Sequence, residues 1–130
     1  MAKSENLKEF DKWFNEWFFG NDKQEVINIF ISAINEIDNI YDENALILYD
    51  ISKRDNNEIS AKPYLKDIFN KVDELGLNIY LFPLPSPLLN NIKSQKYKDR
   101  ITKEYLISYF SKYGFILLEN GYMKRIPIKK

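Results

Sequence analysis

The chain has no cysteine and no histidine among its 130 residues. Without cysteine there is no disulfide and no thiolate nucleophile. The absence of both residue types also excludes a Cys/His zinc site and a Ser-His-Asp triad. We therefore expect no bound metal, and any general acid or base must be Asp, Glu, Lys, Tyr or a terminal amine.

The chain also lacks an excess of charge of either sign, because 19 basic and 19 acidic side chains give a formal net charge of zero. No overall field attracts nucleic acid or an anionic membrane surface. No apolar run approaches the ~18 residues that span a membrane, and the polar first residues contain no apolar signal core. We therefore expect a cytoplasmic protein that binds neither nucleic acid nor membranes.

Apolar side chains, in contrast, are plentiful: 45% of the residues are hydrophobic and 15% are aromatic, which suffices for a packed core. At this length we expect a single domain, 1–130. Its N-terminal segment predicts two helices, one over 5–19 that ends at Gly20 and one that starts in a capping-box-like segment at Asp22 and runs to Ile37. The first helix has a wide apolar face made of Leu7, Phe10, Trp13, Phe14, Trp17 and Phe18. This face either packs on the rest of the domain or contacts a protein partner or a second copy of the chain.

The middle of the chain predicts a strand–helix–strand unit. Residues 41–44 are typical of a turn, and the apolar run 45–51 that follows predicts a strand. A helix over 61–75 and a second strand over 78–82 complete a parallel βαβ crossover. The element order of the whole chain is then α-α-β-α-β-α-β-β, an α/β or α+β fold around a small mixed sheet.

The C-terminal segment predicts a capped helix and a hairpin. Thr102 is a suitable N-cap, and Gly114 is suited to end the helix in a left-handed conformation. Residues 115–119 and 122–127 then flank Asn120-Gly121, a strong signal for a two-residue type I′ hairpin.

The order of these segments resembles the acyl-CoA-binding half of N-acetyltransferases of the GNAT superfamily, particularly the short ones of phages and mobile elements. The resemblance runs from Asn39 to Pro127. It implies a GNAT-like mixed sheet with a parallel βαβ core, two N-terminal helices, and a C-terminal helix plus β-hairpin. The domain would then divide into a helical N-terminal region over residues 1–40 and an acyl-CoA-binding-like region over residues 41–130. The matching stretches are IYDENALILYDI, VDELGL, NIYLFP, EYLISYFSKYGF and GYMKRIP.

The resemblance implies transfer of an acetyl group from acetyl-CoA to an amine of a protein or a small molecule. The cofactor would lie between the two parallel strands, with its pyrophosphate at the N-terminus of the following helix, where free amides attract anions. Tyr113 is the candidate acid, and Asp50 is a candidate base if burial raises its pKa. The candidate cofactor-binding residues are Tyr49, Ile51, Lys53, Glu58, Ile59, Ser60, Ala61 and Lys62.

Each of these assignments has an alternative. Lys62 is also an ordinary solvated lysine in a capped helix start, Tyr113 also fits core packing, and Asp50 also fits an exposed strand end. Ile59 stands where the family has a glycine, and Phe110 stands where it has a tyrosine. The second functional hypothesis is therefore a catalytically degenerate GNAT-fold protein that acts as a protein-interaction module of a phage.

Overall fold

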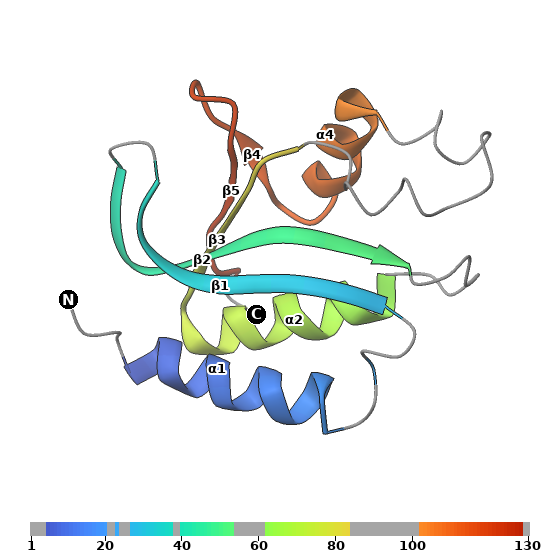
Figure 1. The fold of residues 1–130 in the computed structure, drawn as a ribbon. Coiled ribbons are helices and arrows are strands. Elements are labelled where there is room, and N and C mark those ends of the chain that lie inside the picture. The colour runs from blue at the N-terminus through green and yellow to red at the C-terminus, as the bar shows by residue number, and fades with distance from the viewer. Residues whose placement is uncertain are drawn as a thin grey trace.

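The computed structural model describes residues 5–20, 23, 27–37, 40–53, 62–83 and 102–128. Within these ranges the chain forms three helices and one five-stranded sheet of strand order β1-β2-β3-β5-β4 (Figure 1). The fold is therefore mixed α/β, as the sequence predicted. The elements are α1 (Glu5–Phe18), β1 (Ile27–Ile37), β2 (Ile40–Lys53), α2 (Lys62–Leu75), β3 (Asn78–Leu81), α4 (Lys103–Ser111), β4 (Ile116–Leu117) and β5 (Met123–Arg125).

The predicted parallel βαβ unit is confirmed as β2, α2 and β3. The two strands pair in parallel from Ala45 opposite Asn78 to Leu48 opposite Leu81. Between them α2 ends next to Gly76, whose φ of 69° lies in the left-handed region that glycine tolerates best.

The second predicted helix is wrong, because its residues form the strand β1. This strand pairs antiparallel with β2, from Ile27 opposite Lys53 to Ile37 opposite Ile40. The predicted turn at 41–44 consequently lies inside β2. The fold class with two N-terminal helices and the helical region over residues 1–40 must therefore be corrected to one helix followed by a strand.

The side-chain pattern of β1 explains this outcome. Ile27 and Ile29 are buried in the main core, whereas Phe30 and Ser32, which follow them, are exposed. A period of two with β-branched residues at the buried positions suits a half-buried strand. The capping signal near Asp22 is local, whereas pairing with β2 supplies a hydrogen-bond partner along the whole segment.

The main core lies between one face of the sheet and the helices. Figure 1 shows α1 and α2 side by side along the same face of β1 and β2. Four residues of the apolar face of α1 are buried in this core, which confirms the packing interpretation for these four, and a partner for the rest of the face stays a prediction. The four buried residues are Leu7, Phe10, Phe14 and Phe18.

The C-terminal helix and hairpin are confirmed, but the type I′ turn is wrong. Thr102 caps α4 by accepting a hydrogen bond from the amide of Tyr105 at 3.1 Å. In the hairpin the Leu118 amide donates to the Tyr122 carbonyl at 2.8 Å, so three residues rather than two connect the strands. Gly121 has a φ of 91°, and its amide donates to the Leu118 carbonyl, the pattern of a β-turn followed by a left-handed glycine.

A buried ion pair ties the hairpin to α2. Arg125 on β5 is 3% exposed, and its two terminal nitrogens contact the two carboxylate oxygens of Asp73 at 2.7 and 2.9 Å. Its Nε donates to the carbonyl of Tyr113 at 2.7 Å, and the guanidinium lies 4.9 Å from the ring of Phe69. Arg125 thus connects β5, α2 and the end of α4 at one buried point.

Candidate functional site

A β-bulge interrupts β2 at Tyr49. In the register of β1 and β2, Phe30 lies opposite Asp50 but Ile31 lies opposite Leu48, so Tyr49 has no residue opposite it. Its side chain is 63% exposed. A bulge increases the local twist and bends the strand, and such features recur beside active sites.

The two parallel strands separate directly after this bulge. β3 ends at Leu81, opposite Leu48, whereas β2 runs on from Tyr49 to Lys53. The next residue of the β3 segment, Phe82, packs its ring on Tyr122 of the hairpin, with the ring centroids 4.9 Å apart. Figure 1 shows β3 rising away from β2 at this end of the sheet, so within the described ranges no strand lies beside the last residues of β2 on the β3 side.

Four of the eight predicted cofactor-binding residues lie around this separation. Tyr49 is exposed at the bulge, Ile51 is half-buried against the main core, and Lys53 is the last residue of β2. Lys62 is exposed and is the first residue of α2. The other four, Glu58, Ile59, Ser60 and Ala61, lie outside the described residues.

The two candidate catalytic residues come from different elements, Tyr113 from the segment after α4 and Asp50 from β2. Tyr113 is half-buried, and its ring contacts Phe69 of α2 at 5.2 Å and Tyr109 at 5.5 Å. Asp50 is half-buried on β2 and already has an interaction partner. The described contacts of Tyr113 are with α2, α4 and β5, which fits the core-packing alternative for this side chain.

A row of three tyrosines along α4 and its C-terminal end was missed in the sequence. The rings of Tyr105 and Tyr109 stack at 6.0 Å, and the hydroxyls of Tyr109 and Tyr113 lie 3.5 Å apart. The i, i+4 spacing was the signal for this arrangement, since residues four apart share one helix face. Phe110, at the position of the family tyrosine, is 5% exposed in the core.

A polar cluster on the sheet face away from the helices was also missed in the sequence. One carboxylate oxygen of Asp42 accepts hydrogen bonds from the Asn78 amide at 2.8 Å and from the Tyr80 hydroxyl at 3.1 Å. Burial raises the pKa of the Tyr80 phenol. The ammonium group of Lys124 opposes that shift, and Asp42 adds to it. The sequence hid this cluster because Asp42 belonged to a predicted turn rather than to a strand beside β3.

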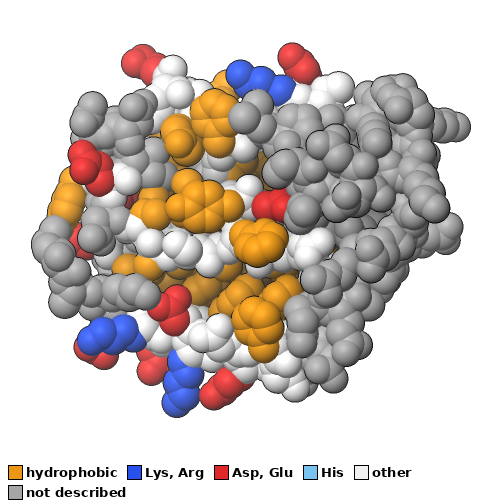
Figure 2. Space-filling view, in the orientation of Figure 1, with side chains coloured by type: hydrophobic (Ala, Val, Ile, Leu, Met, Phe, Trp, Pro, Cys, Tyr) orange, Lys and Arg blue, Asp and Glu red, His pale blue; other side chains and the backbone are white. Residues whose placement is uncertain are grey.

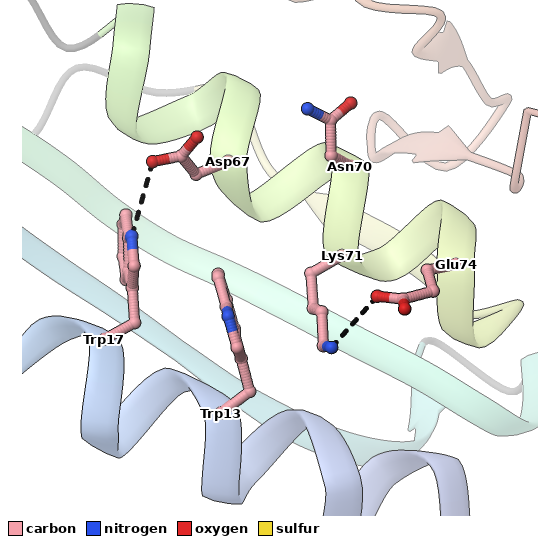
Figure 3. A pocket seen from close by; sticks show the side chains of 6 residues that line it. All are labelled: Trp13, Trp17, Asp67, Asn70, Lys71 and Glu74. Carbon is pink, nitrogen blue, oxygen red and sulfur yellow. Dashed lines mark hydrogen bonds and ion pairs between the residues drawn. The ribbon is translucent and has the colours of Figure 1, made fainter.

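A groove of about 320 Å³ lies between α1 and α2 (Figure 3). The rings of Trp13 and Trp17 stack at 5.0 Å along one wall, and the Trp17 indole donates to Asp67 at 3.3 Å. On the other wall the Lys71 ammonium contacts the Glu74 carboxylate at 2.9 Å. The groove contains none of the predicted site residues, and these polar groups pair with one another.

No group of carboxylates suited to a metal ion occurs among the described residues. Of the helices in the same ranges, none has the length and apolar character needed to cross a membrane. No protein-family model, curated protein or solved structure matches the chain. The resemblance to GNAT proteins therefore stays a prediction, carried by the sequence pattern.

Proposed function

We propose that this protein is a GNAT-like acyltransferase that transfers an acetyl group from acetyl-CoA to an amine of a protein or a small molecule. The observation that supports this proposal best is the separation of β2 from β3 directly after the bulge at Tyr49. A pair of parallel strands that opens at its carboxyl end offers an extended ligand a place beside strand backbone.

The backbone at the end of β2 suits the pantetheine arm of the cofactor. This arm is extended and carries two amide groups, so it can hydrogen-bond to an open strand much as an added peptide strand does. In our proposal the backbone from Tyr49 to Lys53 makes these contacts. Backbone groups there must have some partner or water, because buried amides and carbonyls are rarely left unpaired.

The start of α2 suits the pyrophosphate. This 14-residue helix begins at Lys62, and the partial positive charge of its N-terminus lies at the same end of the sheet as the end of β2 (Figure 1). Lys62 is exposed and adds a positive charge. Residues 58–61 would supply the amides that precede the helix.

The chemistry needs two proton transfers. The acceptor nitrogen attacks the thioester carbonyl, the carbon–sulfur bond breaks, and the thiolate leaves. In the proposal Tyr113 protonates the thiolate, and Asp50 takes the proton that the amine loses. Both groups would have to reach the substrate from different elements.

The second candidate function is a degenerate GNAT-fold protein that serves as an interaction module of a phage. Two observations favour it: Phe110 is buried in the core where the family has its tyrosine, and Tyr113 packs on Phe69 of α2. Such a protein would keep the fold without turning over acetyl-CoA.

Calorimetry with acetyl-CoA and desulfo-CoA tests the proposal, followed by release of free CoA with a panel of amines. We expect micromolar to millimolar binding that Lys62→Ala weakens severalfold, because an exposed lysine at a helix start contributes only modestly to anion binding. The matched control is Lys66→Ala, an exposed lysine of α2 that lies four residues further on. Tyr113→Phe should lower turnover with little effect on binding.

The outcomes separate the two functions. Absence of binding at millimolar cofactor would rule out both the acyltransferase activity and the proposed cofactor site. Binding without turnover for any amine favours the interaction module.

A further inference from the structure

The outer edge of β1 is a long strand edge without a neighbour in the described ranges. β1 has 11 residues and pairs with β2 on one side only, because it is the first strand in the sheet order. Figure 1 shows it as the outermost strand, in front of β2. An edge strand presents a row of unpaired amides and carbonyls, which is a template for another strand.

This edge lacks most of the features that normally prevent pairing, and its one irregularity is the register shift with β2 between Ile34 and Glu36. Edge strands of soluble monomers are usually very short, or carry lysine, proline or an inward-pointing charge. The segment from Ile27 to Ile37 has no proline, lysine or arginine, and its only charged residue is Glu36. At the other edge of the sheet β4 has only two residues, so that edge is short.

An exposed aromatic side chain marks the same edge. Phe30 is 53% exposed, on the sheet face that the helices do not cover, and the exposed Tyr49 of the bulge lies next to it in the register. Figure 2 shows hydrophobic side chains gathered across the middle of the face seen in that view. Apolar groups gathered on a surface often mark a protein contact.

We propose that two copies of this chain pair antiparallel through β1, with the two-fold axis at Ser32. This symmetric register centres the contact on the regular stretch around Ser32, because the register of β1 with β2 is irregular between Ile34 and Glu36. It continues the five-stranded sheet of one copy into that of the other. The contact is isologous, so the same strand serves both sides.

The side chains fit this register. Opposite residues in an antiparallel pair point to the same face, so Phe30 of each copy lies against Ile34 of the other on the face away from the helices. Glu36 lies opposite Asn28, and no like charges face each other. The only charged residue of the strand is Glu36 near one end, so two copies can pair through this edge without opposing like charges.

The size of the contact predicts a weak dimer. Eleven residues at ~3.4 Å each give an edge of at most ~37 Å and at most about ten backbone hydrogen bonds, and the irregularity between Ile34 and Glu36 lowers that number. A strip ~10 Å deep buries on the order of 400 Å² per copy, which is about half of the ~800 Å² per partner of a standard specific interface. We therefore expect a dissociation constant in the micromolar range.

Sedimentation velocity of the full chain, from about 1 µM to about 1 mM, tests the proposal. The wild type should shift from monomer to dimer over this range. Ser32→Lys and Ser32→Glu each place like charges opposite one another at the axis, and each should raise the dissociation constant more than about tenfold. Ser32 is exposed, so both variants should fold.

Mixing the two variants is the decisive step. An equimolar mixture of Ser32→Lys and Ser32→Glu chains should form a heterodimer at least as readily as the wild type, which an unfolded variant would not do. The matched control is Ile116→Lys, which places a charge at a 65% exposed apolar position on the opposite edge strand and should leave dimerisation unchanged. A wild type that stays monomeric throughout, a mixture that fails to pair, or an equal effect of the control overturns the proposal.

Discussion

At the scale of single residues, loss of the ion pair between Arg125 and Asp73 should strongly lower the stability of the fold. Removing one partner leaves a buried charge without compensation, which costs about 3–5 kcal/mol. We expect Arg125→Met to lower the free energy of unfolding by that amount in urea titrations, because Asp73 then loses both of its short contacts to the guanidinium. Replacing both partners by apolar residues should recover some of the loss.

The control for this prediction is Glu74→Gln, because Glu74 lies next to Asp73 on α2. Glu74 pairs with Lys71 at the surface and is 64% exposed, so its loss should change stability by at most about 0.5 kcal/mol. Similar losses for Arg125→Met and Glu74→Gln would show that burial does not decide the strength of these pairs.

Tyr80 gives a residue-scale prediction about pH. Burial raises the pKa of its phenol above 10.0, so the folded protein keeps this proton longer than the unfolded chain does. The resulting stabilisation is complete below the unfolded pKa and is lost as pH rises through the raised folded pKa. In an absorbance titration of tyrosinate, Tyr80→Phe should remove one late-ionising group.

A parallel titration of Tyr122→Phe serves as the comparison, since Tyr122 is a half-buried tyrosine of the same sheet face. If Tyr80→Phe removed only a phenol that ionises in the ordinary range, the burial argument would fail.

At the scale of elements, the sequence predicted those segments whose signals are local. The helices α1, α2 and α4 were predicted because an apolar stripe coincides with a cap or a glycine at one end. β2 and β3 were predicted from their short apolar runs. β1 was not predicted, because the spacing of its isoleucines fits either a helix or a strand. Only pairing with β2, which follows the hairpin turn, makes the segment a strand.

The turn chemistry of the hairpin was also only partly predictable. Asn120-Gly121 correctly indicated a hairpin, but the register that sets a three-residue connection depends on how β5 pairs with β3 and β4. A one-residue shift would turn Met123 and Arg125 away from the core. The tertiary environment therefore selects the turn.

Two glycines allow an element-scale prediction on the cost of a side chain. At Gly76 an added Cβ meets nothing within 4 Å, so Gly76→Ala should cost only the ~1–2 kcal/mol of a left-handed residue. At Gly121 the same atom would lie 3.3 Å from the ring of Phe82, and φ is 91°. Urea titrations should therefore show a larger loss for Gly121→Ala, and the reverse order would contradict the packing of Phe82 on the turn.

At the scale of the whole molecule, the candidate site depends on features that no single segment carries. The bulge at Tyr49 is defined by the register with β1, and beside it β3 ends and Phe82 packs on Tyr122 of the hairpin. The resemblance therefore pointed to the carboxyl end of β2 without predicting the bulge. It also did not predict that Tyr113 would pack on α2.

The sheet order makes the C-terminal hairpin a central component of the fold. β5 lies between β3 and β4, with Met123 fully buried and Arg125 bound to Asp73, 52 residues earlier in the chain. We expect a chain that ends at Gly114 to lose cooperative unfolding, because β3 would lose its neighbour strand and the core would be exposed at that side. Arg125→Met should instead keep a single sharp transition at lower urea. If the shortened chain still showed one sharp transition, by both fluorescence and circular dichroism, the elements from α1 to α4 would fold without the hairpin.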